Sequence, residues 1–208
     1  MPDFQLERLA LSEGYQAVAG LDEAGRGSLF GPVVSAAVLF PSAQINMEVE
    51  GWMLRIDDSK KLSPLRRQRL CRQILMNAEG VGWGLASHSE IDRYNIHRAA
   101  EKSMQRALER LPVEPDFVLV DGFKLNDVQY AQRRVPQGDQ KSISIAAASI
   151  VAKVLRDEII THLDHIFEGY SLAKHKGYGT REHYQALARL GPSVLHRKTF
   201  NLKHHTET

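Results

Sequence analysis

Residues 18 to 40 read VAGLDEAGRGSLFGPVVSAAVLF, and this stretch indicates how the fold begins. Residues 18–23 and 33–40 are rich in small and β-branched side chains, which favours two strands. The glycines between them predict a loop. Two adjacent acids, Asp22 and Glu23, stand where the first strand ends, and Arg26 is the one charged side chain of the loop. Two acids beside a loop with few large side chains indicate a functional site as well as a turn.

The composition is that of a folded domain in a reducing compartment. The chain has 208 residues, of which 43% are hydrophobic, and a formal net charge of +2, which is typical of a globular protein. Its single cysteine, Cys71, has no partner for an internal disulfide. No signal peptide or membrane-spanning run is visible, so we expect a cytoplasmic protein without a membrane partner. A monomer is the simplest expectation.

The rest of the sequence alternates strand patterns with helix patterns. Further strands are predicted over residues 81–86, 117–120 and 133–135. Helices are predicted over residues 64–78, from Asn95 to Leu111 before Pro112, over residues 145–167, and from Thr180 to Gly191. We therefore expect a mixed α/β sheet with a helical tail. Residues 1–170 and 171–208 would be its two parts, effectively one domain.

Acids follow two of the predicted strands. Asp22 and Glu23 end the first, and Asp121 ends the wholly apolar run at residues 117–120. A charged side chain in such a place is costly to bury unless it is paired or bound to a metal, and carboxylates around a crevice suit Mg²⁺. Neighbouring strand residues face opposite sides, so we expect a twist or bulge, which Gly25 permits, to bring Asp22 and Glu23 together. Ordinary solvated turns remain the alternative for each acid taken alone.

The glycine loop does not match the usual nucleotide-binding motifs. The dinucleotide fingerprint would need glycine where Phe30 stands, and no Gly-Lys-Ser/Thr follows. Gly25, Arg26 and Gly27 instead offer bare backbone that can approach a sugar and one guanidinium that can bind phosphate. Backbone close to a ribose could read the 2′-hydroxyl, which separates RNA from DNA.

Seven blocks of the chain resemble bacterial ribonuclease HII, the type 2 ribonuclease H, in the order seen in that family. They are AGLDEAGRGSLFGPVVSAAV, DDSKKLS, EIDRYNI, VDG, GDQKSISIAAASIVAKVLRD, AKHKGYGT and GPSVLHRKTF. The resemblance implies a ribonuclease H-like fold, a five-stranded mixed sheet flanked by helices with a helical C-terminal part. It also implies Mg²⁺- or Mn²⁺-dependent cleavage of RNA paired with DNA. Single ribonucleotides in duplex DNA would be cut on their 5′ side, leaving 3′-hydroxyl and 5′-phosphate ends.

The resemblance also assigns roles to residues. The four metal-binding acids of the family fall on Asp22, Glu23, Asp121 and Asp139, with two ions expected in the active complex. Asp139 lies before a predicted helix, and its pattern alone favours a plain loop acid. The tripeptide that reads the junction falls on Gly25 to Gly27, and the tyrosine that stacks on the adjacent deoxyribose falls on Tyr178. Asp157, a rival acid within a predicted helix, is interpreted as structural.

Several polar residues are expected to contact the phosphate backbone of the duplex. These are Lys60, Lys61, Lys141 and Ser142, for which plain solvent exposure is nearly as favoured. Ser28, Phe30, Phe123, Gln140 and Ser171 depart from the common family pattern, which concerns loop shape more than chemistry.

Two other functions are compatible with parts of the sequence. A non-catalytic module could bind RNA–DNA hybrids through the basic loop from Lys174 to Tyr178, but four carboxylates would repel such a polyanion. A nucleotide-using α/β enzyme is disfavoured because the phosphate-binding motifs are absent.

Overall fold

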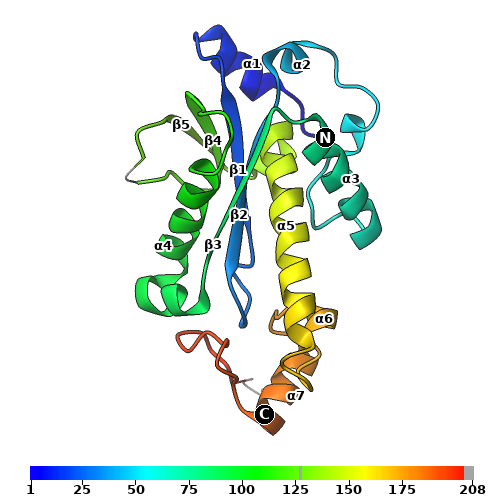
Figure 1. The fold of residues 1–208 in the computed structure, drawn as a ribbon, viewed down its shortest axis with the longest axis vertical. Helices are drawn as coiled ribbons and strands as arrows, with labels where there is room; N and C mark the ends of the chain where they lie inside the picture. Colours follow the sequence, from blue (N-terminus) through cyan, green and yellow to red (C-terminus); the bar gives the residue numbers. More distant parts are fainter. Residues whose placement is uncertain (127, 204–208) are drawn as a thin grey trace.

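The structure is a computed structural model that describes residues 1–126 and 128–203, and its centre is one five-stranded mixed sheet (Figure 1). The strand order is β3-β2-β1-β4-β5. β1 pairs antiparallel with β2 and parallel with β4, and β4 pairs parallel with β5. The strands are β1 (Val18–Ala24), β2 (Val33–Leu39), β3 (Gly80–Ala86), β4 (Phe117–Asp121) and β5 (Ala131–Val135). All five predicted strands are present, and the predicted fold class is confirmed.

The described residues also form seven α-helices and two short 3₁₀ turns. The helices are α1 (Gln5–Ser12), α2 (Ser42–Asn46), α3 (Pro64–Asn77), α4 (His88–Leu108), α5 (Ile143–Asp164), α6 (Leu172–His175) and α7 (Arg181–Leu190). The 3₁₀ turns are η1 (Met53–Arg55) and η2 (Gly138–Gln140).

Helix α4 begins earlier than the sequence pattern predicts. Ser87 and Glu90 form a reciprocal capping box, which starts the helix at His88, about two turns before Asn95. Asn95 itself has φ 70° and interrupts the helix, and its side chain accepts hydrogen bonds from the backbone of His97 and Arg98. The predicted start at Asn95 is therefore wrong for the helix as a whole, although Asn95 does cap its second segment.

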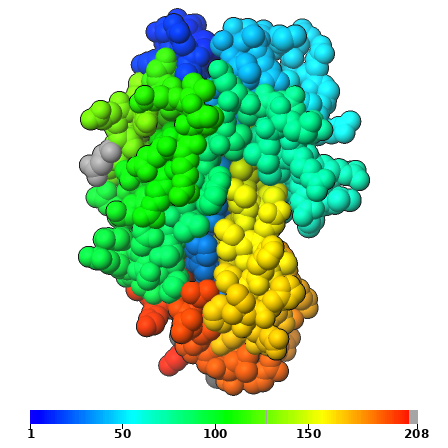
Figure 2. Space-filling view, viewed as in Figure 1, coloured from blue at the N-terminus to red at the C-terminus, as the bar shows by residue number. Residues whose placement is uncertain are grey.

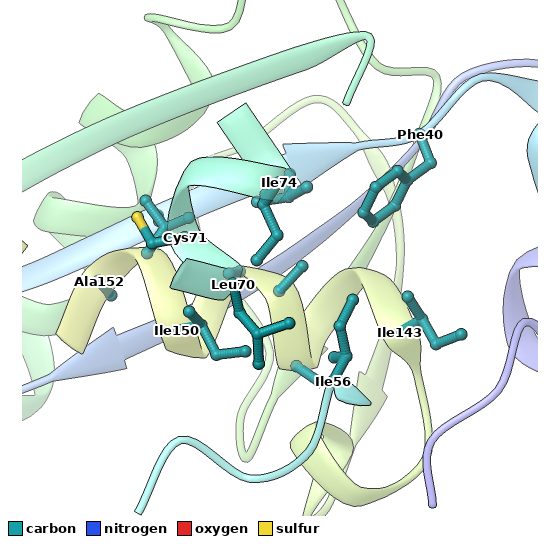
Figure 3. Close-up of a cluster of buried hydrophobic side chains, with 14 of the residues drawn as sticks. Phe40, Ile56, Leu70, Cys71, Ile74, Ile143, Ile150 and Ala152 are labelled. Carbon is teal, nitrogen blue, oxygen red and sulfur yellow. The ribbon is translucent and has the colours of Figure 1, made fainter. Parts of the chain in front are cut away.

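The two faces of the sheet are covered by different helices (Figure 1). Alternate residues of β2 point to opposite faces, so that Ala36 and Val38 pack toward α5 and α3, whereas Ala37 and Leu39 pack toward α4. Figure 3 shows the first of these clusters, in which side chains of α3, α5 and the end of β2 interdigitate. Burial of both faces explains why β2 and β4 read as nearly continuous apolar runs.

Helix α5 lies unusually close to β1 at Gly20. A Cβ at this position would lie 2.2 Å from the carbonyl carbon of Ser144 and 2.4 Å from the backbone nitrogen of Ile145. Gly20 thus permits direct contact between strand and helix backbones. This contact sets the distance between α5 and the end of β1, where the acids lie.

The C-terminal part packs on the far end of α5. Leu172 of α6 and Leu187 of α7 form one buried cluster with Ile160 of α5 and with Leu29 and Phe30 of the glycine loop. Figure 2 shows this part, coloured orange and red, against the end of yellow α5. The predicted division at residue 170 stays a prediction, and residues 204–208 of its second part lie outside the described residues. Among the described residues, no helix has the length and apolar character needed to cross a bilayer.

We expect Gly20→Ala to destabilise the protein, because the added methyl group has no space between β1 and α5. Overpacking of this kind costs about 1–3 kcal/mol, and more where backbone atoms must move. Urea unfolding measures the change. Gly27→Ala is the matched control, since nothing lies within 4 Å of its added Cβ. Equal unfolding midpoints for the two variants would contradict the close approach.

Candidate active site

Two predicted acids lie side by side at the ends of neighbouring parallel strands. Leu21 of β1 pairs with Val120 of β4, so Asp22 and Asp121 occupy corresponding positions one residue further on. The alternation of side chains places both on the face that α5 covers. Asp22 is only 6% exposed. The carboxyl ends of parallel strands therefore bring these two carboxylates together, as predicted from the apolar run before Asp121.

Glu23 reaches the same region from the opposite face of β1. The expected bulge is absent, because pairing with β2 continues without interruption through Glu23, opposite Ser35, and Ala24. The expectation was wrong because the acids need not share a face. Asp121 acts electrostatically on both Asp22 and Glu23 at the strand ends. The site thus wraps around the end of β1.

Asp139 joins this group through the turn η2. The backbone N–H of Gly138 donates a hydrogen bond of 2.6 Å to Asp121 Oδ1, which ties η2 to the end of β4. Asp139 is 7% exposed, and burial raises the pKa of its carboxyl, as do the charges of Asp58 and Asp121. Asp22, Glu23 and Asp139 therefore each interact electrostatically with Asp121, the fourth predicted acid.

Burial and mutual repulsion make ionisation of these acids unfavourable. Burial raises the pKa of Asp22 well above its ordinary value, and the charges of Glu23 and Asp121 raise it further. Burial also raises the pKa of Glu23 to about 7; the Arg26 guanidinium opposes this shift and Asp121 adds to it. A bound cation would remove most of this repulsion, so the acids are suited to hold one.

Lys60 is the internal counter-charge of the acid group. Partial burial lowers the pKa of Lys60, but neighbouring acids, first Asp22 and then Asp58, raise it more, so its net pKa shift is upward. Asp58 is 8% exposed and accepts a hydrogen bond of 2.9 Å from the Lys60 backbone. Lys60 was predicted to contact a phosphate of the duplex, and in the structure it also lies beside the carboxylates.

The donor set fits a hard divalent cation. Carboxylate oxygens are the ligands that Mg²⁺ and Mn²⁺ prefer, and the Oε2 atom of Glu23 is buried without a hydrogen-bond partner among the described residues. Across residues 1–126 and 128–203, no group of three or more potential ligands already surrounds a position for an ion. The acids lie together at one strand end. A cation bound there would take oxygen ligands from the acids and from a phosphate.

The loop after β1 is held from inside by a buried arginine of α5. Gly25 has φ 100°, and a Cβ there would lie 2.0 Å from Nε of Arg156, so only glycine fits. The guanidinium of Arg156 is fully buried and donates to the carbonyl oxygens of Phe30 and Pro32 and to the hydroxyl of Ser28. These three hydrogen bonds leave the loop little freedom.

A second buried arginine, Arg197, holds the same loop from the C-terminal segment. Its guanidinium donates to the carbonyl of Arg26 at 2.9 Å and to that of Gly31 at 3.0 Å. The side chain of Arg26 remains exposed, lies 3.4 Å from Glu23 Oε1, and stacks over the ring of Phe123 at 5.5 Å. The ring of Phe123, a departure from the family pattern, therefore supports Arg26, and the Phe123 backbone N–H donates to the backbone carbonyl of Asp121 at 2.8 Å.

Tyr178 lies next to this loop although 150 residues separate them in sequence. Its backbone bridges to Ser28, whose hydroxyl donates to the Gly177 carbonyl at 2.9 Å. The half-buried ring has the charged groups of Lys153 and Arg156 each 5.3 Å from its centroid. The predicted sugar-reading residues, Gly25 to Gly27 and Tyr178, thus belong to one connected surface.

The other predicted contacts have mixed positions. Lys61 and Lys141 are exposed, as phosphate contacts require. Ser142 is fully buried; its hydroxyl caps α5 at Ile145 and donates to Glu7, so we leave Ser142 out of the contact set. Asp157 pairs with Lys153 and Arg67, in agreement with a structural role.

Some residues of the site were missed by the sequence analysis. Asp58 could have been found, since it precedes Lys60 in a run of charged residues. Arg156 stands beside Asp157 in a helix whose first ten residues carry no charge, which is a weak signal of a buried charge. Nothing in the sequence indicated that Arg197 is buried.

Comparisons with known proteins agree with one family. The family model described as Ribonuclease HII matches residues 19–205. Ribonuclease HII of Geobacter sulfurreducens is 47% identical over 197 residues, which cover 95% of this chain and 88% of that protein. Ribonuclease HII of Caldicellulosiruptor bescii is 43% identical over 197 residues, covering 95% and 92%. The ribonuclease H2 structure from Pyrococcus horikoshii OT3 is similar in fold, with a TM-score of 0.72 at 23% identity over 89% of this chain and 94% of that one.

We expect Glu23→Gln to stabilise the metal-free protein at about pH 8, on the order of 3 kcal/mol. The folded state holds the Glu23 proton up to about pH 7, against 4.5 ordinarily, so stability falls as the pH rises from 4.5 to about 7. Glutamine removes this loss. Thermal unfolding in EDTA across that range measures it. The two midpoints should converge at the acidic end, and a wild type as stable as the variant at about pH 8 would contradict the repulsion.

Proposed function

The chain belongs to the ribonuclease HII family, whose members are metal-dependent endonucleases that cleave RNA in RNA–DNA hybrids, and we propose that it also cuts at single ribonucleotides embedded in duplex DNA. The gathering of Asp22, Glu23 and Asp139 around Asp121, beside the loop of Gly25 to Gly27, carries the proposal. The carboxylates suit hydrolysis of a phosphodiester, and the adjacent bare backbone suits recognition of the sugar next to it.

The four acids share one part in the proposed reaction. Asp22, Glu23, Asp121 and Asp139 would hold two divalent cations, Mg²⁺ or Mn²⁺. When bound, such ions supply an activated water for in-line attack and stabilise the departing 3′-oxygen. Lys60 balances the charge of the acids while the site is free of metal. Cleavage on the 5′ side of the ribonucleotide would leave a 3′-hydroxyl and a 5′-phosphate.

Recognition of the sugar is assigned to two elements. The backbone of Gly25 to Gly27 can approach the 2′-hydroxyl without hindrance from side chains. The ring of Tyr178 would stack on the deoxyribose that follows the ribonucleotide. The loops that carry these groups are joined through Ser28. The groups that would recognise the 2′-hydroxyl and the deoxyribose are therefore held at a fixed separation.

The remaining contacts and the setting follow from the same scheme. Exposed Lys61 and Lys141, together with Lys60, would contact backbone phosphates and position the duplex without reading its sequence. We propose a monomer that works in the cytoplasm. Residues 1–170 would form the catalytic part, and residues 171–208 would form an extension packed on it.

We expect Asp22→Asn to lower kcat on a duplex with one ribonucleotide by about 10³-fold, because a buried carboxylate that would hold the cations is lost. The fold should survive, since asparagine has the same shape and removes a repelling charge. Mapping the cut ends by gel electrophoresis measures cleavage. EDTA added to the wild type is the control and should abolish cutting. Near-normal cleavage by this variant would refute the scheme.

We expect Tyr178→Ala to slow cleavage at a single ribonucleotide by roughly tenfold or more, since stacking on an aromatic ring contributes about 1–3 kcal/mol. Tyr178→Phe keeps the ring and should stay close to the wild type. Binding of Mn²⁺, followed by calorimetry, should be unchanged in both variants. Weakened Mn²⁺ binding with equal loss on all substrates would argue against a role in reading the sugar.

A further inference from the structure

Two buried histidines outside the acid group face each other through their ring nitrogens. His183 lies on α7, and His196 lies on the C-terminal segment that follows it; both are 0% exposed. Their Nε2 atoms are 3.0 Å apart. A hydrogen bond between two such nitrogens requires that one carries a proton and the other does not.

The partner of His183 at its other nitrogen determines where its proton lies. His183 Nδ1 is 3.0 Å from the backbone carbonyl oxygen of Tyr178. A carbonyl oxygen only accepts, so Nδ1 of His183 must carry the proton. In a neutral ring Nε2 of His183 is then bare and can accept a hydrogen bond from His196.

The partner of His196 gives the complementary answer. The backbone N–H of Ser193 donates to His196 Nδ1 at 2.9 Å, so this nitrogen is bare. The proton of a neutral His196 therefore lies on Nε2 and points at His183. Every donor meets an acceptor along the resulting histidine chain, which runs from the Ser193 N–H through His196 and His183 to the Tyr178 carbonyl. A second proton on either ring would oppose two donors.

The histidine chain connects the two elements assigned to the sugar. At one end, His196 bridges to Phe30, and the Arg197 N–H donates to the Leu29 carbonyl at 2.9 Å, so this segment is paired with the loop that begins at Gly25. At the other end, His183 donates to the carbonyl of Tyr178. The side chains thus form a second link between the loops, separate from that through Ser28.

The link to Tyr178 is more than helix capping requires. The Thr180 hydroxyl already caps α7 by accepting from the His183 backbone, and the Thr180 N–H already donates to the Tyr178 carbonyl at 2.8 Å. His175 stacks on the His183 ring with centroids 4.4 Å apart and accepts the N–H of Tyr178 through its own backbone carbonyl. Burying two imidazole rings costs desolvation free energy that apolar side chains would avoid. What the imidazoles provide and apolar side chains cannot is a set of directional hydrogen bonds.

We propose that His183 and His196 are positioning residues for Tyr178, holding its backbone at a fixed place relative to the Gly25 loop and thereby setting discrimination at single ribonucleotides. The inference rests on the proposed sugar-reading role of Tyr178. Neither histidine touches the substrate. They act through the carbonyl of Tyr178.

Nitrogen-15 NMR of the imidazole rings tests the histidine chain without any substrate. We expect His183 to be the Nδ1–H tautomer and His196 the Nε2–H tautomer, with scalar coupling across the hydrogen bond between their Nε2 atoms. An Nε2–H tautomer for His183, or a doubly protonated ring at neutral pH, would overturn the chain.

Two variants of His183 separate its bonds. In His183→Asn the amide nitrogen takes the place of Nδ1 and keeps the bond to Tyr178, whereas in His183→Gln the longer side chain keeps the bond to His196 and loses Tyr178. Both variants lose the stacking on His175, so the two variants are matched in this loss of stability. The quantity to measure is kcat/KM at a single ribonucleotide divided by kcat/KM on a continuous hybrid. We expect His183→Gln to lower this ratio roughly three- to tenfold, which corresponds to the loss of one hydrogen bond. His183→Asn should keep the ratio near that of the wild type.

The same substitution in a Tyr178→Ala background completes the test. If His183 works through Tyr178, His183→Gln should change the ratio no further there, because coupled residues are not additive. Equal effects in both backgrounds, or a wild-type ratio for His183→Gln, would overturn the positioning role alone. A wild type that cuts hybrids but never single ribonucleotides would overturn the proposed function and this role with it.

Discussion

Repulsion between carboxylates gathered at the end of one strand is the constraint on which the rest of the site depends. Asp22 and Glu23 are adjacent in β1 and leave it on opposite faces, and Asp121 ends the neighbouring strand. Their charges oppose one another in a poorly hydrated place, so the folded protein holds an arrangement that is unfavourable without a cation. Lys60 moderates this repulsion. The core on both faces of the sheet supplies the stability that tolerates it.

Recognition and cleavage are linked by the way buried arginines hold the glycine loop. Arg156 and Arg197 bond to carbonyl groups of this loop from two sides, and Gly25 lies directly against the first of them. The loop begins after Ala24, one residue beyond Glu23. A sugar that bound against the loop, as proposed, would be placed at a set distance from the acids, which is what cutting at one defined bond requires.

Much of the fold could be predicted because apolar periodicity reports burial. The five strands and the long helices were visible, and the apolar run before Asp121 correctly indicated a strand that ends in an acid. Where bonds between distant residues decide the outcome, the sequence was less informative. The burial of Ser142 depends on Glu7, and the pairing of Lys60 with the acids depends on a loop that no periodicity describes. Asp139 came from the family resemblance, since its local pattern is that of any loop acid.

Helix α5 runs from the acids to the loops of Gly25 and Tyr178 as one uninterrupted element. Ser149 lies near Asp22 at one level of the helix, and Arg156 holds the glycine loop two turns later. One residue inserted between them would turn all that follows by about 100° and advance it by about 1.5 Å. Arg156 would then face away from the loop. Insertions and deletions should accordingly be excluded from this segment during evolution, even where individual side chains are free to vary.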